Sequence, residues 1–290
     1  MVRVGAPRLP GVAAFLTAGA VVLTGCGTQA PPRPQASPVT TPAAPAATRT
    51  TIGALSAGAQ SGPASGSSSA ATATITAPGK TLKLGAKGKS VTWLQRRLAE
   101  LGYRPGKADG RYGGATLTAV WAFQKVNGIK PTSTIAKRTW AALETPKSPK
   151  VLVKNGKPTR AEVNLTKQIM VLYVGGQVKL ITHVSSGSGI PYCESATWQG
   201  KEQRFCGSAS TPTGNFKTTW RANGWHKSYL GQLYNPIFFN GGIAFHGALS
   251  VPLYPASHGC VRMPMNVAEV LPGMLGKGVP VYVRGKFRRP

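Results

Sequence analysis

The sequence predicts a small domain of three helices followed by a larger, mainly β domain with a sandwich or barrel-like sheet. In the first part of the folded chain, apolar residues recur every three or four positions, which is the spacing of amphipathic helices. In the second part they alternate with polar residues, and glycine-rich turns separate the alternating runs. Repeated short strands of this kind are typical of sandwiches and barrels.

Residues 1–25 have the features of a secretory signal. Arg3 and Arg8 give a positive start, and the apolar run that follows, residues 11–23, is too short to span a bilayer. The run ends in Leu23-Thr24-Gly25-Cys26, which resembles the bacterial lipobox, where the cysteine becomes the acylated first residue. The resemblance implies an exported lipoprotein, anchored through Cys26 to the outer face of the cytoplasmic membrane. The alternative is an ordinary cleaved signal that contains a cysteine.

Residues 26–79, beginning with the lipidated cysteine, are expected to form a disordered tether. Pro, Ala, Thr, Ser and Gly dominate this segment, and large apolar residues are scarce. Such a composition cannot bury enough apolar surface to fold. A flexible chain of this length has a root-mean-square span of about 40 Å. The tether would therefore lift the folded domains off the membrane and into the cell wall.

Residues 80–145 are predicted to form the helical domain. The apolar residues at helical spacing fall into three groups, which are Val91, Leu94, Leu98 and Leu101, then Leu117, Val120, Trp121 and Phe123, and finally Trp140 and Leu143. The runs Leu94-Gln95-Arg96-Arg97-Leu98, Asp109-Gly110-Arg111-Tyr112-Gly113 and Ala122-Phe123-Gln124 resemble the three-helix peptidoglycan-binding domain. The resemblance implies binding to the cell wall, and the alternative is a helical spacer without a ligand.

Residues 150–285 are predicted to form the β domain, after a proline-containing segment at 146–149 that is expected to act as a hinge. The first strands should form a hairpin around the Gly175-Gly176 turn. The expected strands are 161–165, 169–174, 178–181, 216–220, 237–239, 243–246 and 279–283, and one helix is expected near 266–275.

The charge of the chain favours anionic partners and limits the possible chemistry. The net charge is +28, from 35 Lys and Arg against 7 Asp and Glu. Anionic wall polymers or acidic lipid would attract such a protein. Nucleic acid is not expected, because the basic residues are scattered and no recognition-helix, zinc-finger or aromatic ribonucleoprotein pattern occurs. Asp109 is the single aspartate, which leaves almost no material for a Ser-His-Asp triad or an Asp-rich metal cage.

The segment Ser257-His258-Gly259-Cys260-Val261-Arg262, with Phe245-His246-Gly247 upstream, carries the strongest chemical signal. A thiol is nucleophilic as its thiolate, so a catalytic cysteine needs an imidazole or another positive influence nearby. A glycine next to the cysteine lets a backbone amide approach a developing oxyanion. The segment thus supplies a nucleophile, a base and an oxyanion donor. The alternative is a buried structural cysteine beside a core histidine.

At these residues the sequence resembles the L,D-transpeptidase (YkuD-type) catalytic family over about residues 151–283. The family motif has an upstream His, then Ser/Thr-His-Gly-Cys, a hydrophobic residue and Arg or Asn, and Thr211-Pro212-Thr213-Gly214-Asn215-Phe216 stands upstream in the usual order. By resemblance, Cys260 is the nucleophile and His246 the base, with its second ring nitrogen held by a main-chain carbonyl. His258 would support the thiolate or the oxyanion region.

The remaining motif residues are expected to contact substrate or to shape the oxyanion region. Gly259 and Gly247 bring the backbone close, and Ser257 would supply a positioning hydrogen bond. Arg262 would hold a substrate carboxylate through its planar fork. The alternative for Arg262 is an ion pair that braces the loop, with Glu194, Glu202 or Glu269 as partner. His183 and His226 lie in no motif and are expected to be ordinary core or surface residues.

The resemblance implies an enzyme that cross-links the cell wall without a metal or an organic cofactor. Cys260 would attack the third, diamino-acid residue of a donor tetrapeptide, release terminal D-alanine and pass the acyl group to the amine of another peptidoglycan stem, giving a 3→3 cross-link. The first alternative is a carboxypeptidase or cysteine hydrolase that gives the acyl group to water. The second is a non-catalytic peptidoglycan-binding lipoprotein. A zinc peptidase is disfavoured because His-Glu-x-x-His is absent.

The four cysteines can then be assigned. Cys26 takes the lipid and Cys260 stays free for catalysis, which leaves Cys193 and Cys206 as a disulfide pair. An exported location permits this bond. A bridge over a loop of this size stabilises by about 3 kcal/mol in the chain-entropy description. The alternatives are two free thiols or a metal site, but no histidine lies between these two cysteines.

Overall fold

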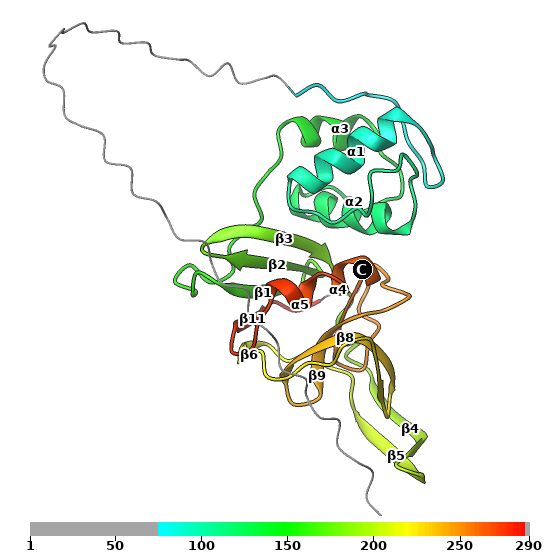
Figure 1. Cartoon of the computed structure of the whole chain (residues 1–290), viewed down its shortest axis with the longest axis vertical. Coiled ribbons are helices and arrows are strands. Elements are labelled where there is room, and N and C mark those ends of the chain that lie inside the picture. The colour runs from blue at the N-terminus through cyan, green and yellow to red at the C-terminus, as the bar shows by residue number, and fades with distance from the viewer. Residues whose placement is uncertain (1–74, 288–290) are drawn as a thin grey trace, which may run out of the picture. The chain divides into compact units, whose positions relative to one another are not determined.

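The computed structural model describes residues 75–287 (Figure 1), and these residues lie in one compact unit. The expected signal segment, the lipidation site Cys26 and nearly all of the expected tether lie outside the described residues. Across residues 75–287, every helix is too short or too polar to cross a bilayer.

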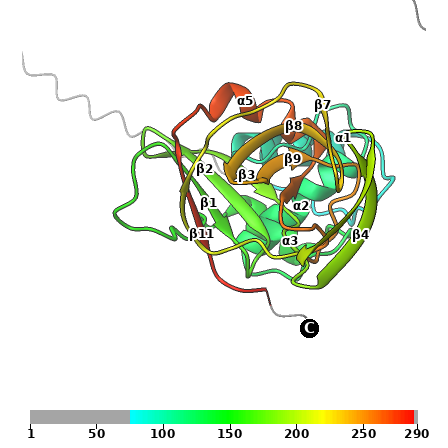
Figure 2. The same cartoon turned by 90° about the horizontal axis from the view of Figure 1, so that it is seen from below.

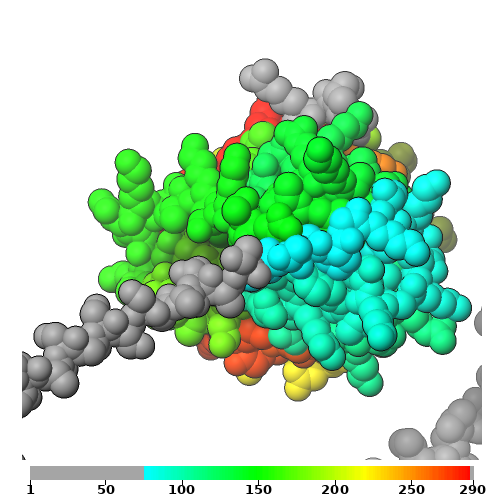
Figure 3. All heavy atoms as spheres, turned by 90° about the horizontal axis from the view of Figure 1, so that it is seen from above, coloured from blue at the N-terminus to red at the C-terminus, as the bar shows by residue number. Residues whose placement is uncertain are grey.

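The helical region contains α1 (Lys89–Glu100), α2 (Gly114–Val126) and α3 (Lys137–Glu144), where the apolar spacing predicted helices. Their apolar faces meet around Leu94, Leu98 and Phe123, which are fully buried. Gln95 is also buried and holds the neighbouring loop, because its Oε1 accepts from Gly110 N at 2.9 Å while its Nε2 donates to Arg111 O at 3.0 Å. In the view of Figure 3, this region and the segment after it, coloured cyan to green, form most of the visible surface.

The β domain begins with a five-stranded sheet in the order β3-β2-β1-β11-β6, of which Figure 2 labels β3, β2, β1 and β11. The strands are β1 (Arg160–Asn164), β2 (Ile169–Val174), β3 (Gln177–His183), β6 (Gly214–Lys217) and β11 (Pro280–Arg284). The expected hairpin is present as β2 and β3, and β1 pairs in parallel with β11. The first and last strands of the domain are therefore neighbours.

A second sheet has the order β10-β9-β8-β7. Its strands are β7 (Trp225–Ser228), β8 (Gly231–Asn240), β9 (Ile243–Gly247) and β10 (Val261–Met263). One buried cluster joins the two sheets, with Val163 and Met170 from the first and Phe245 and Val261 from the second. Two sheets that share one core form a sandwich, so the prediction of a mainly β domain is confirmed.

Strand β2 has a continuous apolar sequence because both of its faces are buried. Met170 and Leu172 point into the core between the sheets. Ile169, Val171 and Tyr173 belong instead to the core of the helical region, together with Ile181 of β3. The backbone joins the same two regions, since Ile181 N donates to Gly102 O at 2.9 Å. The expected hinge at 146–149 therefore does not separate two independent cores.

Several parts of the β domain differ from the sequence prediction. Strands β7 and β10 were not predicted, and the strand expected at 216–220 lies at Gly214–Lys217 as β6. The expected single helix at 266–275 is two short helices, α4 (Met265–Ala268) and α5 (Leu271–Met274). Pro272 explains the break, because proline fits the first turn of a helix but not its interior. The hairpin of β4 (Pro191–Trp198) and β5 (Lys201–Ser208) was not predicted. In Figure 1 it projects away from the two sheets, and its largely exposed strands lack apolar alternation.

Candidate active site

The second sheet brings His246 and Cys260 to the same face. Strand β10 pairs in parallel with β9, so that Arg262 lies opposite His246 and Val261 opposite Phe245. Continuing this register by one residue places Cys260 beside Ala244, two positions before His246. Alternate residues of a strand share a face, and Phe245 and Val261 point to the other face, into the core. The structure thus gathers the histidine and the cysteine that the sequence separates by a loop.

The thiol of Cys260 lies in a largely apolar setting. Cys260 is the free cysteine of residues 75–287, and it packs against Leu233, Phe238 and Ala244. Its Sγ lies 3.6 Å from Gly242 O, to which the thiol donates. Burial raises the pKa of Cys260, opposed by a hydrogen bond from the backbone amide of Ala244 and by the charge of Arg262. The thiol is therefore protonated at neutral pH in the ligand-free site.

His246 is arranged to accept a proton through Nε2. Its side chain is buried, and Nδ1 lies 2.9 Å from Gly247 O. A carbonyl oxygen can only accept, so Nδ1 carries the hydrogen and Nε2 presents a lone pair. Burial lowers the pKa of His246 to about 4, the Gly247 carbonyl raises it and Arg262 lowers it further. The imidazole is neutral at pH 7, and the expectation of a main-chain carbonyl partner is confirmed.

We expect the alkylation of Cys260 by iodoacetamide to keep rising above pH 9. Only the thiolate reacts, and burial raises the thiol pKa above its ordinary value, so deprotonation is completed only at high pH. His246 should add no step near neutral pH, because its pKa is about 4. The rate should be measured in full-length Cys26→Ala, in which Cys260 is the remaining reduced cysteine. A rate that is already constant between pH 5 and 7 would instead indicate a thiolate–imidazolium pair.

Ser257 holds the turn that carries the thiol. Its Oγ donates to Cys260 O and accepts from Gly259 N at 3.1 Å. Gly259 has φ of 140°, and an added Cβ would lie 3.1 Å from Ser210 O, so glycine is required there. The Gly259 amide is already bonded to Ser257 and would have to leave that bond to serve an oxyanion.

Thr211 is a site residue whose contact sequence reasoning missed. Its hydroxyl donates to Gly259 O and accepts from Gly187 N at 2.8 Å. An added Cβ on Gly187 would lie 2.3 Å from Ala209 O. The upstream motif that begins with Thr211 thus bonds directly to the turn of Cys260. The motif order indicated that Thr211 belongs to the site, but no pattern in the sequence indicated this partner.

The β4–β5 hairpin brings a carboxylate to His258. Glu194 Oε1 lies 2.7 Å from His258 Nε2, and the ring of Tyr192 meets that of His258 edge-on with centroids 4.7 Å apart. The next residue in the hairpin is Cys193, which is bonded to Cys206 as the sequence predicted. Glu194, considered above as a partner of Arg262, therefore pairs with His258 instead.

Arg262 lies opposite His246 in the pairing of β10 with β9, and its charge lowers the pKa of both His246 and Cys260. Among residues 75–287, the ion pairs do not include Arg262, so the alternative, bracing of the loop by a glutamate, is not found there. Gly247 contributes through its backbone. Its carbonyl holds His246, and an added Cβ would lie 2.9 Å from Ala268 and 3.0 Å from Tyr234. Close packing therefore requires glycine at this position.

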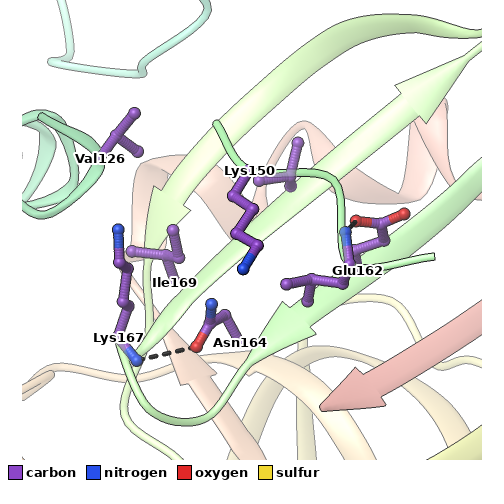
Figure 4. A pocket seen from close by; sticks show the side chains of 8 residues that line it. Val126, Lys150, Glu162, Asn164, Lys167 and Ile169 are labelled. Carbon is purple, nitrogen blue, oxygen red and sulfur yellow. Dashed lines mark hydrogen bonds between the residues drawn. The ribbon is translucent and has the colours of Figure 1, made fainter. Parts of the chain in front are cut away.

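A small pocket elsewhere in the molecule does not belong to this site. Figure 4 shows it between α2, β1 and β2, with Val126, Lys150 and Glu162 among its lining residues. Glu162 is already bonded there, since its carboxylate accepts from Arg160 Nε and from Leu152 N, each at 2.7 Å. None of the motif residues lines this pocket, so we assign it no catalytic role.

Both folded regions of the chain match families of cell-wall proteins. Residues 158–283 match the YkuD family, described as the L,D-transpeptidase catalytic domain. Residues 87–143 match a peptidoglycan-binding domain family. These matches define the class as an enzyme that acts on peptidoglycan and that carries a wall-binding domain, and such domains indicate an exported protein.

Among the similar solved structures, the first described here supports this class. An L,D-transpeptidase of Xylanimonas cellulosilytica is 37% identical, with 71% of this chain and 98% of that chain covered and a TM-score of 0.62. An L,D-transpeptidase of Stackebrandtia nassauensis is 26% identical over 71% of this chain and 96% of that chain, with a TM-score of 0.39. The first similarity extends across both the helical region and the sandwich. The chain belongs to the YkuD-type L,D-transpeptidase family.

Proposed function

We propose that this L,D-transpeptidase forms 3→3 cross-links through an acyl-enzyme on Cys260 and releases terminal D-alanine from a donor tetrapeptide. The observation that supports this most directly is the placement of His246 and Cys260 on one face of neighbouring strands. The hydrogen bond of His246 Nδ1 to Gly247 O adds to it, because it leaves Nε2 as the proton acceptor.

The first half-reaction forms a thioester. Cys260 Sγ attacks the carbonyl carbon of the diamino-acid residue in position three, and His246 Nε2 takes the thiol proton. The C–N bond to D-alanine breaks as the tetrahedral intermediate collapses, and the same proton passes to the leaving amine. Because thiol and imidazole are both neutral at rest, proton transfer accompanies the attack. The thiol must also turn away from Gly242 O.

The second half-reaction transfers the acyl group. The side-chain amine of an acceptor stem attacks the thioester carbonyl, and His246 Nε2 removes a proton from this amine. The C–S bond breaks, the new amide is the cross-link, and the proton returns to Cys260. In this proposal Arg262 binds a substrate carboxylate in the plane of its guanidinium, and the Glu194–His258 pair supports the region of the thiolate.

Mass spectrometry of peptidoglycan fragments tests this function. Disaccharide tetrapeptides incubated with the protein should give 3→3 dimers and one free D-alanine for each acylation. Tripeptide without dimer would support the alternative, an L,D-carboxypeptidase or cysteine hydrolase that passes the acyl group to water. Unchanged tetrapeptide, with binding to sacculi retained, would support a non-catalytic wall-binding lipoprotein. Cys260→Ala is the matched control for chemistry not due to the thiol.

A lipid on Cys26 is the second part of the proposal, and it rests on the apolar run and the lipobox-like end of the first 26 residues. Two or more acyl chains are sufficient for stable anchoring. Cys26→Ala should therefore move the protein from the membrane fraction to the soluble fraction of cells. Salt washing controls for attraction between the chain, of net charge +28, and anionic wall polymers. Unchanged membrane association after the wash would refute the anchor.

A further inference from the structure

His183, at the end of β3, contacts both the helical region and the loop before the catalytic turn. Its side chain is fully buried. Nδ1 lies 2.8 Å from Lys125 Nζ of α2. Nε2 lies 3.0 Å from Val251 O and 3.1 Å from Pro252 O. The ring of Trp121, also of α2, meets the imidazole edge-on with centroids 5.4 Å apart.

The hydrogen positions follow from the partners. Nε2 has two carbonyl partners, whereas Nδ1 has Lys125 Nζ at 2.8 Å and the more distant Gln168 O at 3.2 Å. An ammonium group can only donate, so Nδ1 presents its lone pair to Lys125 and Nε2 carries the hydrogen of a neutral ring. Lys125 therefore donates to Nδ1, and a second Nζ hydrogen reaches Gln168 O at 3.1 Å. Burial lowers the pKa of His183 to about 3, aided by the charge of Lys125, and it lowers the pKa of Lys125 to about 7. These directions agree with a neutral imidazole.

The loop that His183 holds is residues 248–256, which connect His246-Gly247 to the turn of Cys260. This loop has no regular structure, and Leu249 is 86% exposed. Its first residue, Ala248, donates through N to Met263 O of β10 at 3.0 Å, and the end of β3 and the residues after it bond to the rest of its inner side. Ser185 Oγ donates to Tyr254 O at 2.7 Å, and Ala256 N donates to Ser186 O at 3.0 Å. His183 supplies the attachment at Val251 and Pro252, in the middle of the loop.

We propose that Lys125 and His183 form a positioning pair through which α2 of the peptidoglycan-binding domain fixes the loop 248–256, and with it the turn that carries Cys260. A buried amine and imidazole each lose hydration, a cost that apolar side chains would avoid. The pair instead fixes an orientation, because Lys125 orients the imidazole of His183 and the imidazole binds two carbonyls of the loop. The role in turnover rests on the transpeptidase function proposed above.

The test compares two substitutions of His183 in the full chain. Glutamine retains a donor and an acceptor on one planar group, whereas leucine retains only volume. His183→Leu should lower kcat for tetrapeptide donors at least tenfold, with KM changed by less than about threefold, because the substrate contacts remain. Amide exchange in residues 249–255 should rise at least about tenfold as the loop opens. His183→Gln should restore kcat to within about threefold of wild type.

Two further variants separate the pair from general packing. Lys125→Met leaves His183 in place and should raise loop exchange in the same residues. Asn266→Ala is the matched control, because Asn266 Nδ2 donates to Arg104 O at 2.9 Å and joins the same two regions away from the loop. It should change neither kcat nor exchange in 249–255.

The proposal is overturned if His183→Leu leaves loop exchange at the wild-type level, or if Asn266→Ala raises it equally. It is also overturned if glutamine fails to restore what leucine loses. Should wild type make no cross-links at all, the proposed function fails. The exchange measurement would still decide whether the pair fixes the loop, because exchange requires no turnover.

Discussion

Cys260→Ser is expected to lower donor turnover by a factor on the order of 10³ or more while leaving the fold intact. A hydroxyl has a far higher pKa than a thiol, so it needs a stronger base. Serine enzymes obtain one by placing a carboxylate behind the histidine. His246 has the Gly247 carbonyl in that position, and the nearby carboxylate of Glu194 is bonded to His258. D-Alanine release, measured with thermal unfolding as the control for folding, checks this expectation.

The same variant tests the nucleophile without any peptide substrate. A β-lactam carbonyl should acylate Cys260 and add its mass to the intact protein, and the family resemblance makes a carbapenem the reagent of choice. Cys260→Ser should show no adduct. An adduct of equal yield on the serine variant, or D-alanine release at the wild-type rate, would refute the assignment of Cys260.

His246→Ala is expected to slow acylation about 100-fold or more, as the loss of a general base usually does. The neutral thiol of Cys260 would then have to lose its proton to water, and burial has already raised its pKa. The rate of carbapenem acylation followed by mass spectrometry measures this step alone. The pH dependence should also change, because acylation by the variant should increase steadily with pH through the titration of the thiol.

His258→Ala is the matched control for that experiment. Its imidazole is partly exposed and bonded to Glu194 on the hairpin, so its loss should slow acylation less than the loss of His246. If His246→Ala keeps full activity and His258→Ala does not, the roles of the two histidines are reversed.

Local patterns predicted the parts of this protein that depend on local sequence. The alternation of Ala161, Val163 and Leu165 predicted a strand, and the helical spacing of Leu94 and Leu98 predicted α1. The break of the last helix could also have been read from Pro272. The element that covers the second face of β2 could not have been predicted, because a continuous apolar run does not indicate what packs on each side of a strand.

The side-chain contacts within the site could not be predicted from the sequence for a different reason. Glu194 and His258 are 64 positions apart and share no motif. The hairpin that carries Glu194 has no apolar alternation. His183 was expected to be an ordinary core or surface residue because it lies in no motif. Its importance depends on Lys125, which is 58 positions away on α2. Contacts between distant polar residues leave no periodic signal.

The core that joins the helices to the outer face of β2 and β3 makes the helical region and the β sandwich one rigid unit. Pulling them apart would bring Ile169, Val171, Tyr173 and Ile181 into water, and each of the three aliphatic side chains among them contributes about 1.5–3 kcal/mol. Their sum is comparable with the whole free energy of unfolding of a domain, about 5–15 kcal/mol. A strand of peptidoglycan bound by the helical region would therefore stay at a constant distance from the Cys260 thiol.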